Sequence, residues 1–341
     1  MTGKLFGKAF ILLIFYLFIC SLIYFISYFA LTKKNFIDIP VFKSIQRNLY
    51  YELFVEVWQN KPECISFDED LIYVPKIGSC KHQNAEFDTI LNFTNSGRLM
   101  PKITNKNAKS IVVLGDSHAM GWGVNDKETF SYFLQDLAKQ PVYNLAVSSY
   151  GTEREIVRLE KSGLLENSDI IIIQYHENDL RENENFHKIK KDEYMNIFTN
   201  MTSLKKNKLT IMKKTLRHYK SSLRQIFIII TNISRNKTKK LDFKPHYIPL
   251  IESIKKIKNF SEKRIIIFYS DSPSLRFDNF PNGFDEKYSN VYFYNIYNSK
   301  FSEELNSEEN YFFLDRHPNK FGHRKIAQSL YNVLKSDIFN N

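Results

Sequence analysis

Hydrophobic and polar positions along this chain fall into three successive patterns. From Ala9 to Leu31, 23 consecutive residues carry no charge and are mostly apolar. A polar stretch with few apolar runs follows, from about Asn35 to Lys109. Beyond it, short apolar runs alternate with segments whose apolar residues recur at helical spacing. We therefore expect an apolar helix, then a loop-rich stretch, then a strand–helix domain.

The strand–helix part predicts a parallel sheet. Its expected strands are apolar throughout and lack the alternation of a strand with one wet face. Strands that are apolar on both faces are typical of a parallel sheet covered by helices on both sides, in which function sits at the carboxyl ends of the strands. The expected strands are 111–114, 142–147, 170–173, 265–269 and 291–294, and the expected helices lie around 130–137, 153–165 and 326–334.

The apolar stretch predicts a membrane anchor. A helix of this length is about 34 Å long at about 1.5 Å per residue, enough for a bilayer core. Phe29-Ala30-Leu31 is a poor cleavage site, and Cys20 lacks the small residues that precede a lipoprotein cysteine. We predict an uncleaved transmembrane signal-anchor over residues 1–33, against the alternative of a buried helix in a soluble domain. The flanking lysines give no orientation, because they stand on both sides: Lys4, Lys8, Lys33 and Lys34.

Composition and charge change this picture at one segment. A chain of 341 residues with 43% hydrophobic and 25% charged residues is not a disordered scaffold or a small disulfide-rich module. Residues 188–240 hold 15 Lys and Arg against Asp192 and Glu193, so this segment accounts for the net charge of +11 and the rest sums to about −2. It is an insertion between the third and fourth strands. Three interpretations stay open: a helical lid with a solvated charged face, a membrane-surface element contacting anionic lipid, or a rim for an acidic polysaccharide. A nucleic-acid partner is not expected.

Two cysteines follow the apolar stretch. Cys64 and Cys80 are 16 residues apart. They form a disulfide if the body of the protein is exported, or remain two free thiols. No spacing of His, Cys and carboxylate residues resembles a metal site, and no cofactor is expected.

The expected strand ends carry the parts of an acyl-transfer site. Gly115-Asp116-Ser117-His118 follows the first strand, and His176-Glu177-Asn178-Asp179 follows the third. Leu314-Asp315-Arg316-His317-Pro318-Asn319 precedes the last helix. A serine nucleophile, a histidine base, an orienting carboxylate and an amide donor are what such a site needs.

Four blocks in this order resemble the SGNH (GDSL-type) hydrolases, in particular membrane-anchored bacterial members related to esterases and O-acyltransferases. The blocks are Gly115–Ser117, Asn144–Thr152, Asn178-Asp179 and Asp315–Asn319 with Gly322-His323; the segment Thr94–Arg98 adds to the likeness. The resemblance implies an α/β fold with a flavodoxin-like three-layer α/β/α parallel sheet over residues 109–341, including the insertion 188–240. Residues 34–108 are then a loop-rich linker or N-terminal extension.

The resemblance also implies roles. Ser117 attacks an ester carbonyl, His317 takes its proton, and Asp315 holds the imidazole. The backbone N–H groups of Ser117 and Ser149 and the side chain of Asn178 form the oxyanion hole. Simpler alternatives are a helix cap for Asn178, a cap and a surface histidine for Asp315 and His317, and structural roles for His118, His176 and His323.

Three positions depart from the family pattern. Ser149 stands where a glycine is usual, so its Cβ restricts φ. Asp315 lies two residues before His317, where many members have three. His118 replaces the leucine of the GDSL name.

We therefore expect a serine esterase anchored in the inner membrane, with its catalytic domain periplasmic or extracellular. Its expected substrates are O-acyl esters, above all O-acetyl esters, of envelope or secreted polysaccharide. The alternatives are a polysaccharide O-acetyltransferase, a lipid esterase or lysophospholipase, and an inactive carbohydrate-binding component.

Overall fold

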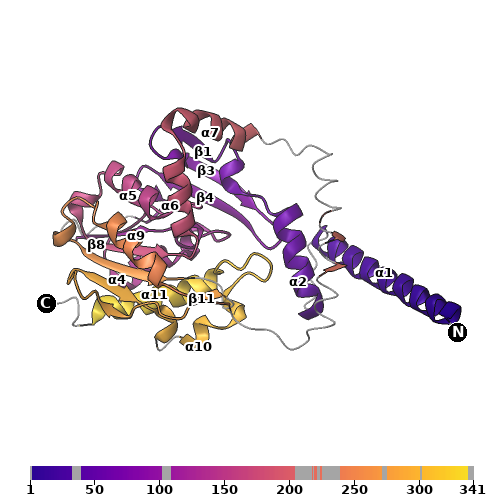
Figure 1. The fold of residues 1–341 in the computed structure, drawn as a ribbon. Coiled ribbons are helices and arrows are strands. Elements are labelled where there is room, and N and C mark those ends of the chain that lie inside the picture. Colours follow the sequence, from indigo (N-terminus) through magenta and orange to yellow (C-terminus); the bar gives the residue numbers. More distant parts are fainter. Residues whose placement is uncertain are drawn as a thin grey trace. The chain divides into compact units, whose positions relative to one another are not determined.

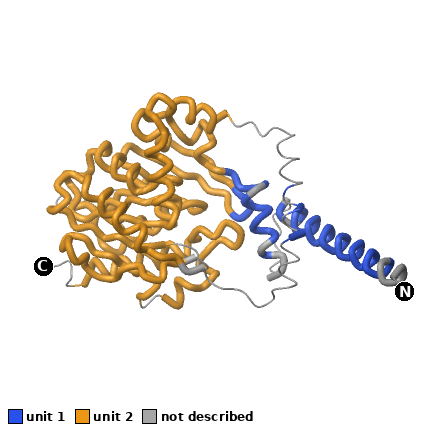
Figure 2. Tube along the Cα trace, in the orientation of Figure 1, with its two compact units in different colours: residues 1–56, 84–86, 205–237 blue, residues 57–83, 87–204, 238–341 orange. Residues whose placement is uncertain are grey.

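The computed structural model describes residues 2–32, 40–101, 109–203, 217, 219–220, 223–224, 239–270, 275–299 and 302–336. The chain divides into two compact units (Figure 2). Unit 1 comprises residues 1–56, 84–86 and 205–237, and unit 2 comprises residues 57–83, 87–204 and 238–341. All candidate site residues named above lie in unit 2.

A six-stranded sheet forms the centre of unit 2. Five of its strands are parallel, and they lie in the order second, first, third, fourth, fifth along the chain, which is the flavodoxin-like order. The short strand β12 (Gly283–Phe284) adds an antiparallel edge. In spatial order the parallel strands are β7 (Val142–Asn144), β6 (Ser110–Leu114), β8 (Ser168–Tyr175), β10 (Arg264–Tyr269) and β13 (Val291–Tyr294).

Helices cover both faces of this sheet (Figure 1). The chain moves from β6 outward to β7 through α4 (Phe130–Ala138) and then back past β6 to β8 through α5 (Thr152–Lys161). Right-handed crossovers in opposite directions place these two helices on opposite faces. α11 (Lys320–Lys335) packs against α4, and α9 (Lys244–Ile254) packs against α5. The three-layer fold class predicted from the sequence is therefore confirmed.

The predicted strands are apolar because they are buried on both sides. All five residues of β6 are buried, as are Ile171, Ile172 and Ile173 of β8. All five expected strands form; the second ends at Asn144 instead of residue 147.

The stretch 34–108 differs from the loop-rich linker that we expected. Its described part contains a helix and five short antiparallel strands, and most of it belongs to unit 2. These strands lack continuous apolar runs because they alternate; β4, for example, buries every second residue over most of its length. The disulfide Cys64–Cys80 lies in this region. The elements are α2 (Pro40–Leu49), β1 (Ile65–Asp68), β2 (Ile72–Pro75), β3 (Gly78–Gln83), β4 (Asp88–Thr94) and β5 (Gly97–Arg98).

Unit 1 contains the long helix α1 (Thr2–Thr32), in which Gly7–Phe29 is long and apolar enough to cross a membrane. Described residues of the basic insertion lie along it. The hydroxyl of Tyr16 donates to the carbonyl oxygen of Leu223 at 3.0 Å, and the Tyr24 and Tyr219 rings are 5.2 Å apart. The apolar run 226–230 of the insertion lies outside the described residues. In unit 2, the insertion begins at the end of α6 (Asp179–Lys188) and continues with α7 (Tyr194–Ser203).

Candidate active site

Ser117 stands at the sharp turn that follows β6. It is the first residue of the short helix α3 (Ser117–Met120), and the Asp116 side chain caps this helix by accepting from the His118 backbone N–H at 2.8 Å. Ser117 Oγ lies 2.7 Å from Nε2 of His317. A serine hydroxyl at hydrogen-bond distance from an imidazole is the pairing that a nucleophile and its base require.

Asp315 completes this arrangement. Its Oδ1 is hydrogen-bonded to Nδ1 of His317, and the residue is only 1% exposed. Arg316, between the two, has a left-handed backbone with φ of 69°, which lets side chains two residues apart meet. The short spacing therefore still brings Asp315 onto His317. Asn319, not Asp315, caps α11, so the simpler helix-cap alternative for Asp315 is wrong.

Trp122 is a site residue that sequence reasoning missed. Its Nε1 donates to Oδ2 of Asp315 at 3.1 Å, and its ring lies nearly parallel to that of His317 with centroids 5.3 Å apart. The buried His82 ring packs against the Trp122 ring with centroids 4.5 Å apart. Burial lowers the pKa of His82 to about 3, so this imidazole is neutral near pH 7. A tryptophan five residues after the nucleophile was the only sequence signal for this contact.

His118 contacts the base from another side. Its ring centroid is 4.7 Å from that of His317 and 4.9 Å from that of His176. Burial, then the neighbouring histidines, lower the pKa of His118 well below its ordinary value. The neutral imidazole of His118 is therefore a buried packing group, in agreement with a structural role.

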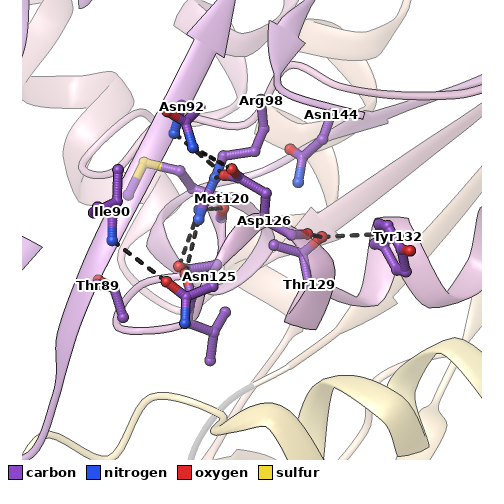
Figure 3. Close-up of polar contacts among 12 residues, drawn as sticks. Thr89, Ile90, Asn92, Arg98, Met120, Asn125, Asp126, Thr129, Tyr132 and Asn144 are labelled. Atoms are coloured by element: carbon purple, nitrogen blue, oxygen red, sulfur yellow. Dashed lines mark hydrogen bonds and ion pairs between the residues drawn. The ribbon is translucent and has the colours of Figure 1, made fainter. Parts of the chain in front are cut away.

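Arg98 holds the loop that follows the nucleophile (Figure 3). Its guanidinium donates to the carbonyl oxygens of Met120 at 2.7 Å and Val124 at 2.7 Å, and its Nε lies 2.6 Å from Oδ1 of Asp126. These partners begin and end the loop that carries Trp122. Arg98 is 1% exposed, so these contacts are shielded from water.

Gly97 packs strand β5, which also contains Arg98, against the motif block Asn144–Thr152. It has φ of 95°, and a Cβ there would collide with the Asn144 carbonyl oxygen. Asn144 Nδ2 in turn donates to the Ala119 carbonyl oxygen at 2.8 Å. The segment Thr94–Arg98 thus supports the nucleophile turn.

Ser149 adopts a backbone conformation that favours glycine. Its φ is 63°, in the left-handed region. Two contacts hold it there: Gln59 Nε2 donates to its hydroxyl at 2.8 Å, and the Arg154 guanidinium donates to its carbonyl oxygen. Within the described ranges, its backbone N–H has no hydrogen-bond partner. The departure from glycine therefore leaves this donor available.

Asn178 follows β8, the strand on the other side of β6 from β7. The loops that carry Ser149 and Asn178 thus flank the Ser117 turn. Asn178 is the N-cap residue of α6, but its side chain makes no capping hydrogen bond. Its Oδ1 lies 2.7 Å from Nδ1 of His176. The simpler alternative, that its side chain serves as a cap, is wrong.

Two buried acids lie beside these blocks. Glu155 is 2% exposed and Asp179 is fully buried. Burial, reinforced by neighbouring carboxylates, raises the pKa of both well above the ordinary range. Among the described residues, no group of three or more His, Cys, Asp or Glu side chains is arranged to hold a metal ion.

No family model and no curated protein sequence matches the chain. Similar solved structures include a protein described as lipolytic and of the G-D-S-L family from Desulfitobacterium hafniense DCB-2, at 11% identity and a TM-score of 0.32, covering 66% of this chain and 99% of that one. A two-domain esterase active on acetylated mannans has 13% identity and a TM-score of 0.36, covering 69% and 50%. An acetylxylan esterase mutant from Geobacillus stearothermophilus has 13% identity and a TM-score of 0.32, covering 67% and 95%. Likenesses this distant assign no activity, so the function is inferred from the strand order and side-chain geometry of this chain.

Proposed function

We propose that the protein is a serine esterase of the SGNH type that cleaves O-acyl esters, with O-acetyl groups of envelope or secreted polysaccharide as its substrates. One observation carries the proposal: Ser117 Oγ lies 2.7 Å from His317 Nε2, while the buried Asp315 is bonded to His317 Nδ1. Residues from two distant parts of the chain thus form the hydrogen-bonded series of nucleophile, base and carboxylate that acyl transfer requires. The order of the four motif blocks supports the family, and the polysaccharide substrate rests on the same resemblance.

The chemistry follows from this geometry. Ser117 Oγ attacks the ester carbonyl carbon as His317 Nε2 takes the hydroxyl proton, and Asp315 stabilises the imidazolium. The N–H groups of Ser117 and Ser149 and the NH₂ of Asn178 stabilise the oxyanion. His317 then returns the proton to the departing alcohol oxygen, which leaves an acyl-Ser117 ester. In the second half of the reaction, His317 takes a proton from water, or from a sugar hydroxyl in a transferase, and that oxygen attacks the carbonyl carbon of the acyl-Ser117 ester. His317 then returns the proton to Ser117 Oγ, and the acyl group leaves on the acceptor oxygen.

A catalytically inactive binding component is less well supported. Ser149 was the only feature in its favour, and its backbone retains the left-handed conformation and an unpaired N–H within the described part of the chain. A lipid esterase is the second candidate. It is favoured by the contacts of Tyr219 and Leu223, in the basic insertion, with the apolar helix α1.

We also propose that α1 anchors the protein in the inner membrane with the catalytic domain outside the cytoplasm. The disulfide Cys64–Cys80 supports an oxidising compartment. A thiol titration of the unreduced, denatured chain is expected to detect one thiol, that of Cys20. Three thiols in protein from the native membrane would argue for a cytoplasmic body.

The esterase proposal is tested with the full chain in detergent, using 4-nitrophenyl acetate, butyrate and octanoate. Ser117→Ala is expected to lower kcat by at least about a thousandfold, because it removes the nucleophile. Ser66→Ala is the matched control: Ser66 is also half-buried, and its side chain makes no hydrogen bond to another described residue.

The acyl-chain dependence separates the candidates. Rates that fall from acetate to octanoate support acetyl chemistry, and a preference for octanoate supports the lipid esterase. Equal rates for the parent and Ser117→Ala on all three esters would rule out the acyl-enzyme.

A further inference from the structure

The two ends of an asparagine carboxamide have opposite chemistry. The NH₂ group donates hydrogen bonds and stabilises an oxyanion, whereas the carbonyl oxygen accepts them and repels one. Asn178 is half-buried, and its side chain does not cap α6, so capping does not fix which end faces the site. Another contact must select the orientation if Asn178 is to serve as an oxyanion donor.

His176 makes that contact. Its Nδ1 lies 2.7 Å from Oδ1 of Asn178. A carbonyl oxygen has no hydrogen to donate, so a hydrogen bond across this 2.7 Å contact needs the hydrogen on Nδ1. The backbone N–H of Asn178 lies 3.3 Å from the same Nδ1 and would need that nitrogen as an acceptor, so only one of the two contacts can be a hydrogen bond. The shorter contact decides between them, because two acceptor atoms at 2.7 Å would repel each other. Among the described residues, Nδ2 of Asn178 has no hydrogen-bond partner. The histidine thus occupies the oxygen end and leaves the NH₂ end for a ligand.

The surroundings of His176 favour this tautomer. Oδ2 of Asp116 lies 3.9 Å from the same Nδ1, and a carboxylate there favours a hydrogen on that nitrogen. Oδ1 of Asp116 accepts from the His118 backbone N–H, which fixes the carboxylate next to the nucleophile. The His118 ring packs against that of His176 with centroids 4.9 Å apart.

We propose that His176 is a positioning residue that fixes the Asn178 carboxamide with its NH₂ group toward the oxyanion. This rests on the proposed esterase function and adds to it a residue that touches neither substrate nor reacting atoms. Without His176, the carboxamide rotates, and its oxygen faces the site for part of the time. Because the Asn178 hydrogen bond strengthens only in the transition state, the loss falls on kcat and not on KM.

The test uses the full chain in detergent with 4-nitrophenyl acetate. His176→Ala is expected to lower kcat about tenfold or more with KM changed less than about twofold, which is below the typical loss for deleting an oxyanion donor. His176→Asn places an NH₂ donor near the position of Nδ1 and is expected to stay within about threefold of the parent. In an Asn178→Ala background, His176→Ala is expected to cause no further loss, since the two residues act as one unit.

Three results would overturn the proposal. One is an undiminished effect of His176→Ala in the Asn178→Ala background, which indicates a separate structural role. A second is a normal kcat for His176→Ala while Asn178→Ala is impaired. The third is independent of activity: the ¹⁵N shifts of His176, assigned by their loss in His176→Asn, must show the hydrogen on Nδ1, and an Nε2–H tautomer contradicts the proposal. An inactive parent with an Nδ1–H tautomer overturns the esterase function alone.

Discussion

Trp122 Nε1 donates a 3.1 Å hydrogen bond to Oδ2 of Asp315, on the carboxylate whose other oxygen binds His317. Trp122→Phe keeps a ring beside His317 and removes only the N–H. Hydrogen bonds to charged groups contribute about 1.5–3 kcal/mol, so we expect kcat/KM to fall about tenfold or more on 4-nitrophenyl acetate. Trp58→Phe is the matched control, because Trp58 is fully buried and its Nε1 has no partner among the described residues. Equal losses in both variants would contradict the role of this bond.

Arg98 is expected to stabilise the whole nucleophile region. Its guanidinium serves the Met120 and Val124 carbonyl oxygens and Asp126 together, and a lysine ammonium cannot reach all three. Arg98→Lys should lower the free energy of unfolding by about 3 kcal/mol, measured by denaturant titration. Lys81→Met, which breaks the exposed pair with Asp88, should lower it by less than about 1 kcal/mol. Comparable changes in the two variants would show that burial adds nothing at Arg98.

Ser149 is expected to accept glycine better than alanine. Glycine relieves the cost of the left-handed φ, which offsets the lost hydrogen bond from Gln59. Alanine also loses the hydrogen bond from Gln59, but its Cβ keeps the free-energy cost of the left-handed φ. Ser149→Gly should therefore remain within about 1 kcal/mol of the parent in unfolding free energy, and Ser149→Ala should be about 1 kcal/mol less stable than Ser149→Gly. Denaturant unfolding tests this order, and a more stable alanine variant would contradict it.

Glu155 is expected to make stability fall with rising pH. Its pKa is raised in the folded state, chiefly by burial and then by Asp179 and Asp116, so the folded protein keeps a proton that the unfolded chain releases. The penalty is absent below the unfolded pKa of about 4.3 and grows above it by up to about 1.4 kcal/mol per pH unit until the folded group ionises. Glu155→Gln cannot ionise, so its unfolding free energy relative to the parent should rise between pH 5 and pH 8.

Denaturant unfolding at several pH values measures this difference. Glu160→Gln is the control, because Glu160 is exposed on the same helix α5. A difference between Glu155→Gln and the parent that does not change with pH would show that Glu155 is ionised in the folded protein throughout this range.

Local pattern determined the sheet and the position of the nucleophile. Runs such as 170–173 are apolar on both faces, and only a strand buried between two helix layers keeps such a run from water. Ser117, Asp315 and His317 stood in short motifs beside such elements, so both the fold class and the three candidate residues could be predicted. The strands of residues 57–98 could not, because half-exposed antiparallel strands lack continuous apolar runs and resemble polar loops.

The contacts among these residues were decided by the tertiary structure. Ser117 and His317 are 200 residues apart, and only the sheet order brings their loops together. Trp122 lies in none of the four motif blocks, and Arg98 lies only in the upstream segment Thr94–Arg98, to which no role was assigned from the sequence. Their roles arise from the hydrogen bond of Trp122 to Asp315 and from those of Arg98 to the loop that carries Trp122. The sequence pattern predicts which residues are buried, because the hydrophobicity that favours burial is a property of each side chain alone. A hydrogen bond needs two partners at a set distance and angle, and that pairing exists only once the chain has folded.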